Sequence, residues 1–256
     1  MRQKQTFPMA FALMQRRDRK DYEEVQEHLT GRMREMNVPI KVMQGGNLYT
    51  DMEQAAIQAN KCCLPGANCK ICLFHLGQMS QETVTSNGDK AFLKDATFKH
   101  HIRMANSIVF VPEEKIDEAW AELKTFLEQE DERALKLWKH WDWYCVRGGY
   151  AVNNATGERH RVEPRFPRSM WSLYRETVLS LPRTTNSAES WHRRLESIFL
   201  NPHPNVDQFI QALIKEWTYI KTCIDMTVRG DGSKLKKTMS AADEKRELRI
   251  KDTALR

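Results

Sequence analysis

Short apolar segments alternate with helical periodicity over the first 74 residues, and this alternation constrains the fold more than any other feature. Residues 7–14, 38–43 and 48–50 are apolar runs of strand length. Between the first two runs, apolar residues recur at three- and four-residue spacing, which predicts a helix. Strand, helix and strand in this order favour an α/β sheet with crossover connections.

The same alternation continues toward residue 74. The first helix is predicted to begin at Asp18 or Asp21, because either side chain can cap it. Residues 53–63 are rich in alanine and predict a second helix, which a Pro-Gly pair ends. Residues 69–74 form another short apolar run, and we expect a further strand there.

Helical patterns dominate the remainder of the chain. Pro112 opens a predicted helix, a second one runs to Trp141, and two more are expected over residues 187–200 and 206–226. Residues 148–170 hold Gly, Asn, Pro and Arg without a period, so we expect a loop.

These patterns define the expected domain organisation. One domain over residues 1–228 comprises an α/β lobe at 1–80, a mainly helical insertion at 81–180 and C-terminal helices at 181–228. A basic tail at 229–256, helical or disordered, follows it. The tail holds nine Lys or Arg residues against five acids, and it supplies most of the net charge of +6. A basic chain of this kind suits a nucleic-acid partner, although basic tails are commonly no more than solvated termini.

Cysteine usage and hydropathy indicate a compartment. Four of the six cysteines fall within residues 62–72, a spacing unlike that of a secreted disulfide framework. No signal-peptide pattern and no run of about 20 apolar residues is present. We therefore expect a nuclear or cytoplasmic protein that is not secreted and has no membrane partner.

Asp51 is the first candidate site residue. It directly follows the predicted strand at residues 48–50, and the carboxyl end of a strand is where α/β folds gather ligands. A carboxylate there suits Mg²⁺, which prefers oxygen ligands. The alternative is a local role in a turn or at the start of a helix.

Glu189 is the second candidate. It lies three residues after Asn186, so the pair has the spacing of a capping box in which the glutamate holds the first turn of a helix. A glutamate at the start of a helix can also point into a cleft, so the two roles do not exclude each other.

Cys69, Cys72 and His75, with Cys62 and Cys63 just before them, offer the soft ligands that Zn²⁺ prefers. If residues 69–75 form a strand, however, Cys69 and Cys72 point to opposite faces and cannot hold one ion. Zinc is therefore not expected, and buried free thiols are the default interpretation.

In combination, these segments resemble the transposases of Mutator-like elements (MULEs), which have a ribonuclease-H-like catalytic domain. The resemblance covers an apolar strand and first helix, an acid-bearing motif after a strand, a Cys-x-x-His signature, a Pro-Arg-Thr-Thr-Asn-Ser-Ala-Glu segment and the helix after it. These segments are residues 7–14, 22–25, 50–56, 72–75, 181–192 and 203–216.

The resemblance implies an α/β fold, a ribonuclease-H-like partial mixed sheet with a large, mostly helical insertion and a helical C-terminal part. It also implies phosphoryl transfer on DNA, with carboxylates holding Mg²⁺ or Mn²⁺. Asp51 and Glu189 are then the second and third acids, while Cys72 and His75 order the neighbourhood of the site.

The chain departs from the family pattern at its start. The first acid of the family stands upstream of the segment that corresponds to residues 7–14, and the six residues before Phe7 contain no acid. We therefore expect an N-terminally truncated transposase domain that does not cleave or join DNA by itself. Two alternatives stay open: an active transposase with a misplaced start, and a zinc-stabilised interaction protein unrelated to transposition.

Arg183, Arg193 and Arg194 are the candidate nucleic-acid-binding residues, together with lysines of the tail. Their cations suit sequence-independent, salt-sensitive contacts with DNA phosphates. The sequence leaves self-association open.

Overall fold

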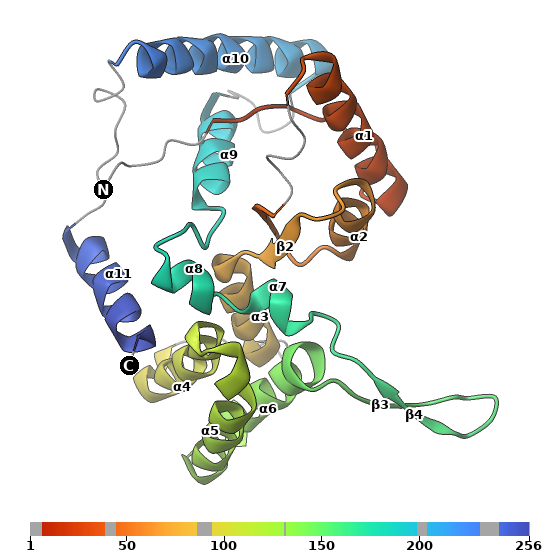
Figure 1. The fold of residues 1–256 in the computed structure, drawn as a ribbon, viewed down its shortest axis with the longest axis vertical. Coiled ribbons are helices and arrows are strands. Elements are labelled where there is room, and N and C mark those ends of the chain that lie inside the picture. The colour runs from red at the N-terminus through yellow and green to blue at the C-terminus, as the bar shows by residue number, and fades with distance from the viewer. Residues whose placement is uncertain are drawn as a thin grey trace. The chain divides into compact units, whose positions relative to one another are not determined.

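The computed structural model describes residues 7–38, 45–85, 94–130, 132–198, 204–230 and 241–255 (Figure 1). The chain forms two compact units. The larger one comprises Gln15–Thr184 and Glu247–Arg256, and the smaller one comprises Met1–Met14 and Thr185–Arg246. The described part of the fold is mixed α/β and mostly helical.

Two helices open the larger unit, as predicted. Helix α1 (Arg19–Glu35) begins after Asp18, whose side chain accepts the backbone N–H of Asp21 at 3.0 Å and caps the helix. Helix α2 (Gln54–Cys63) packs against α1, where the Gln26 side chain donates to Asn60 Oδ1 at 2.9 Å. The strand expected over residues 38–43 falls almost wholly outside the described residues.

Strands β1 (Asn47–Thr50) and β2 (Asn68–Ile71) pair in parallel. Strand β1 confirms the prediction for residues 48–50. Strand β2 is shorter than the predicted run over residues 69–74, because helix α3 (Leu73–Thr85) already begins at Leu73. The apolar residues continue from the strand into the helix without a change of spacing. The boundary between β2 and α3 could therefore not be recognised from the sequence.

The helical part of the larger unit contains α3, α4 (Ala96–Ser107), α5 (Ile116–Glu130) and α6 (Glu132–Trp141). It also contains short 3₁₀ helices at Ile108–Phe110 and Glu113–Lys115 and a π-helical segment at Asp142–Val146. Helices α5 and α6 confirm two sequence predictions. Tryptophans form the centre of the core, since Trp120 and Trp138 stack at 5.5 Å and Trp141 meets Trp171 edge-on at 5.8 Å. The indole N–H of Trp141 donates to Ser80 Oγ at 2.8 Å, which satisfies it inside the core.

The loop predicted over residues 148–170 is wrong. That stretch contains an antiparallel hairpin, β3 (Gly149–Val152) and β4 (Arg159–Val162), followed by the start of α7 (Arg168–Trp171); α8 (Tyr174–Val178) comes next. Most residues of the two strands are polar or small, so the apolar alternation that marks a half-buried strand is missing. Gly148 has a φ of +70°, and a Cβ there would lie 2.1 Å from the carbonyl oxygen of Val162, so this turn needs glycine.

The smaller unit contains α9 (Asn186–Ile198) and α10 (Val206–Val228), both expected from the sequence. Asn205 and Gln208 form a capping box at the start of α10. Helix α11 (Ala241–Ala254) lies in the tail, and its residues from Glu247 on belong to the larger unit.

The strand predicted over residues 7–14 is also wrong, because this segment has no regular secondary structure. Its apolar side chains contact helices of the smaller unit. Phe11 stacks on Trp191 at 5.1 Å and meets Trp217 edge-on at 6.3 Å. An apolar run of strand length needs a neighbouring strand to become one, and the sequence does not show where such a run will pack.

The four described strands form two separate two-stranded sheets, so the ribonuclease-H-like sheet stays a prediction. Among the described helices, none is both long enough and apolar enough to cross a membrane.

Candidate functional site

The carboxyl ends of β1 and β2 bring two sequence-predicted residues to one edge of the larger unit. Thr50 pairs with Ile71 in the parallel register, and the backbone N–H of Cys72 donates to the carbonyl oxygen of Thr50 at 2.9 Å. Asp51 and Cys72 therefore leave neighbouring strands at the same edge. This is the edge at which α/β sheets place ligand-binding side chains.

Asp51 has a local structural role as well. Its Oδ1 accepts the backbone N–H of Glu53 at 3.0 Å, which forms a turn directly before α2. The side chain is half-buried. This contact uses one carboxylate oxygen, so the turn and a metal-binding role are compatible.

Tyr22 of α1 contacts Glu53, close enough to Asp51 to be affected by its charge. Its hydroxyl donates to Glu53 Oε2 at 2.8 Å. Burial, the hydrogen bond to Glu53 and the negative charges of Glu53 and Asp51 together raise the pKa of Tyr22 to about 12. The phenol is therefore neutral near pH 7, and the two carboxylates create a negative potential that favours a cation.

Cys72 and His75 lie at the junction between β2 and α3. A ligand atom of Cys72 and one of His75 lie within 4.8 Å of each other. Nδ1 of His75 is buried and has no hydrogen-bond partner in the part of the chain that the structure describes. A structural zinc site needs four ligands, so this pair alone does not make one, and the expectation of no zinc stays a prediction.

Arg183, a candidate DNA contact, is buried within the larger unit. Its guanidinium donates to Thr177 Oγ1 at 3.0 Å, pairs with Glu247 of α11 and lies over the Phe110 ring at 5.4 Å. Its carbonyl oxygen accepts the N–H of Leu73, the first residue of α3, at 3.1 Å. Arg183 thus holds the helix that carries His75, and a phosphate would have to replace Glu247 to reach it.

Glu189 lies in the first turn of α9, in the smaller unit. Thr185 Oγ1 donates to Glu189 Oε1 at 3.2 Å, and the N–H of Glu189 donates to the carbonyl oxygen of Thr185 at 3.0 Å. The helix begins at Asn186, so Thr185 takes the position that the sequence suggested for Asn186. Glu189 therefore does stabilise the start of the helix, but its partner is Thr185, one residue before the predicted Asn186.

Arg193 and Arg194 are neighbours on α9 with different surroundings. Arg194 Nε donates to both carboxylate oxygens of Glu216 on α10, at 3.0 and 3.2 Å, and its guanidinium lies 3.9 Å from the centre of the Tyr219 ring. Arg193 is exposed, and no carboxylate among the described residues pairs with it. Of the two, Arg193 is the better candidate for a phosphate contact.

Asp51 belongs to the larger unit and Glu189 to the smaller one. Each unit is described by itself, so the expected convergence of these two carboxylates stays a prediction.

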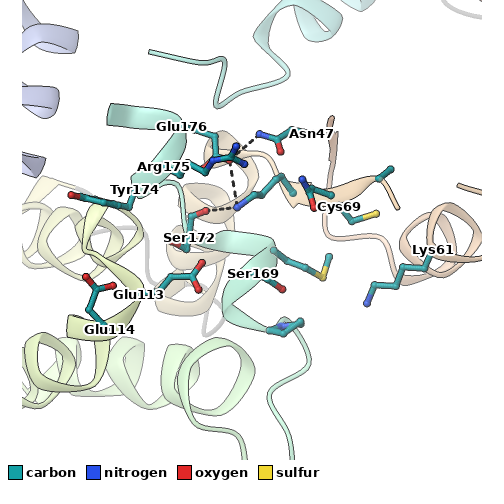
Figure 2. Close-up of a pocket in the computed structure, with 15 residues that line it drawn as sticks. Asn47, Lys61, Cys69, Glu113, Glu114, Ser169, Ser172, Tyr174, Arg175 and Glu176 are labelled. Atoms are coloured by element: carbon teal, nitrogen blue, oxygen red, sulfur yellow. Dashed lines mark hydrogen bonds and ion pairs between the residues drawn. The ribbon is translucent and has the colours of Figure 1, made fainter. Parts of the chain in front are cut away.

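A pocket of about 620 Å³ lies elsewhere in the larger unit (Figure 2). It borders the amino ends of β1 and β2, whereas Asp51 follows the carboxyl end of β1. Inside it, Lys70 Nζ lies 3.6 Å from Glu176 Oε1 and donates to the carbonyl oxygen of Ser172 at 2.8 Å. Figure 2 shows Asn47 and Glu176 pointing toward one another, and Asn47 Nδ2 donates to Glu176 Oε1 at 2.8 Å.

This polar cluster was not predicted from the sequence. Lys70 and Glu176 are both buried, and Glu176 Oε2 has no hydrogen-bond partner among the described residues. The available signal was Lys70, the one charged residue in the apolar run over residues 69–74. A buried cation requires a partner, although the sequence does not say which acid supplies it.

Comparison with known protein families matches residues 1–79 to the MULE transposase domain. Over this segment the chain resembles the MULE transposase family. The matched segment contains Asp51, Cys72 and His75, so the resemblance inferred from the sequence is confirmed there. No curated protein and no solved structure matches the chain.

Proposed function

We propose that the chain is a transposase-derived domain that acts on DNA and in which Asp51 binds a divalent cation. The observation that carries this proposal is the MULE transposase match over residues 1–79. The position of Asp51 beyond the carboxyl end of β1 supports it, since this is where a carboxylate can face a ligand.

In this proposal, Asp51 and Glu189 are carboxylate ligands of Mg²⁺ or Mn²⁺ within a ribonuclease-H-like fold. Such ions supply the stabilisation of charge on a phosphoryl group during strand cleavage and transfer. Tyr22 stays protonated and orients the Glu53 side chain next to Asp51. Cys72 and His75 fix the junction between β2 and α3. Nuclear localisation is part of the proposal because the substrate is DNA.

We also propose that these 256 residues, assayed alone, do not turn over DNA, since only two acids in them, Asp51 and Glu189, lie in motifs that resemble those of the family. The experiment is a nicking and strand-transfer assay with purified protein, a supercoiled plasmid and Mg²⁺ or Mn²⁺. No product is expected. Turnover that Asp51→Ala abolishes would contradict inactivity while supporting the role of Asp51.

A zinc-stabilised interaction protein is the second candidate, favoured by Cys72 and by His75, whose buried Nδ1 has no hydrogen-bond partner among the described residues. Elemental analysis of the purified protein separates the two. Stoichiometric zinc that Cys72→Ser and His75→Ala remove would favour this candidate, and a zinc-free folded protein would dispose of it.

A further inference from the structure

The β3–β4 hairpin extends away from the helices of the larger unit (Figure 1). One of its faces is anchored to the unit. A Cβ on Gly149 would lie 1.8 Å from a ring carbon of Trp143, so the backbone of Gly149 packs directly on that ring. Arg161, whose side chain leaves β4 on the other face, donates from Nη2 to the carbonyl oxygen of Arg147 at 3.2 Å, at the base of the hairpin.

The opposite face is open. In the antiparallel register Tyr150 pairs with Arg161 and Val152 pairs with Arg159, and directly paired residues share one face. Tyr150 and Val152 are 57% and 54% exposed, and both arginines are exposed as well. The exposed face of the hairpin therefore consists of an aromatic ring, a valine and two guanidinium groups.

Charge on this segment is strongly biased. Residues 147–168 contain five arginines and no lysine, against two acids, Glu158 and Glu163. Arg159 lies over the Tyr150 ring at 5.2 Å and has no carboxylate partner among the described residues. Arg161 pairs with Glu163 at 3.3 Å, but both side chains are exposed, so this pair is weak and easily exchanged.

We propose that the exposed face of the hairpin, formed by Tyr150, Val152, Arg159 and Arg161, binds the phosphate backbone of double-stranded DNA. A two-stranded antiparallel ribbon fits the major groove. Guanidinium groups match phosphate oxygens with paired N–H donors, and a tyrosine hydroxyl also donates to phosphate. The inference rests on the proposed action on DNA and assigns a contact surface outside the predicted site residues.

The test is fluorescence anisotropy with a labelled duplex oligonucleotide across a series of NaCl concentrations. Arg159→Ala/Arg161→Ala should weaken binding on the order of tenfold at low salt. The same change should lower the slope of log affinity against log salt by about 2, because each lost phosphate contact contributes about 0.9. Tyr150→Ala should weaken binding by a smaller factor.

The matched control is Arg34→Ala/Arg103→Ala, which removes two exposed arginines from α1 and α4 of the same unit. It should leave affinity and slope nearly unchanged. Circular dichroism and the thermal midpoint establish that both variants are folded, which is expected because all four side chains are exposed.

Each outcome decides a separate claim. Equal loss in the hairpin and control variants, or no loss in either, overturns the hairpin proposal while duplex binding by the unaltered chain still supports the proposed function. Absence of duplex binding by the unaltered chain at low salt overturns both. Displacement by polyglutamate as effective as displacement by unlabelled duplex, at equal charge, would show a surface for acidic polymers and overturn the assignment to DNA.

Discussion

The backbone N–H of Cys72 donates to the carbonyl oxygen of Thr50 at 2.9 Å, one residue beyond the last pair of the β1–β2 ladder. This bond makes Asp51 and Cys72 leave the two strands side by side. The acid and the Cys-x-x-His signature, which are separated by α2 in the sequence, thus lie at a common edge within the segment that matches the MULE transposase domain.

Asp51 is expected to have two roles: one carboxylate oxygen stabilises the turn before α2, and the negative charge binds a metal ion. Asp51→Asn keeps Oδ1 as an acceptor for the N–H of Glu53, so its free energy of unfolding should match that of the unaltered chain. Asp51→Ala removes the acceptor and should cost about 0.5–2 kcal/mol. Urea denaturation measures both values. Equal destabilisation by the two substitutions would show that charge, and not the turn, matters for stability.

Substitutions of Arg193 and Arg194 should affect stability differently, because only Arg194 takes part in the packing of α9 against α10. Arg194→Ala leaves the buried Glu216 with the Trp191 indole as its only described partner, at 3.1 Å, and should destabilise the smaller unit by about 1–3 kcal/mol. The lower end is expected because the Arg194 side chain is 45% exposed to screening solvent.

Arg193→Ala should change stability by no more than about 0.5 kcal/mol, as for other surface positions. Tryptophan fluorescence during urea denaturation reports both variants, since Trp191 contacts Glu216. Equal stability of the Arg193 and Arg194 variants would contradict this assignment.

Local signals predicted α1, α2, α5, α6, α9 and α10, but they did not predict α3 or α4 as individual helices. Helices α1, α5 and α10 each carry an apolar stripe, and α1 and α10 also have a cap that can be recognised without knowing any partner. The hairpin was missed because its strands are held by pairing with each other and by one glycine on Trp143, with no apolar alternation. The prediction of a strand over residues 7–14 was wrong for a different reason. An apolar run does not show whether it will pair with a strand or pack on helices, and this one packs on helices.

The candidate site was also only partly predictable from the sequence. The placement of Asp51 follows from a strand that ends just before it, which the sequence shows directly. The surroundings of Arg183 do not, because Glu247 lies far along the chain in α11. The same holds for Lys70 and Glu176, whose pairing depends on how α8 packs against β2.

The Lys70–Glu176 pair should behave as a buried ion pair. Lys70→Met leaves the Glu176 carboxylate buried with Asn47 as its remaining described donor, and should cost about 3–5 kcal/mol. Adding Glu176→Gln to Lys70→Met removes the uncompensated charge and should recover part of that loss. Thermal denaturation of the single and double variants measures the coupling. Additive effects would show that the two groups do not interact.

Alkaline pH should destabilise the larger unit partly through Cys145. Burial raises the pKa of its thiol far above the usual range, so the folded chain keeps a proton that the unfolded chain releases above about pH 8.5. The contribution of this group is therefore fully present below pH 8.5 and declines as pH rises, by up to about 1.4 kcal/mol per pH unit.

Cys145→Ala removes that contribution. When each protein is normalised to its own stability at neutral pH, the variant should lose less stability than the unaltered chain on the alkaline side. Parallel curves from urea denaturation across that range would contradict the role assigned to burial of this thiol.

Binding of Mn²⁺ tests the central proposal most directly, through a double-mutant cycle on Asp51 and Glu189. Asp51→Asn and Glu189→Gln both keep a side-chain oxygen for the local bonds to Glu53 and Thr185. Electron paramagnetic resonance of free Mn²⁺ gives the affinity of each variant. If the two carboxylates hold one ion, each substitution weakens binding on the order of tenfold or more, and the double variant loses little beyond either single one. Unchanged affinity in Asp51→Asn, or two losses that simply multiply, would contradict a shared metal site.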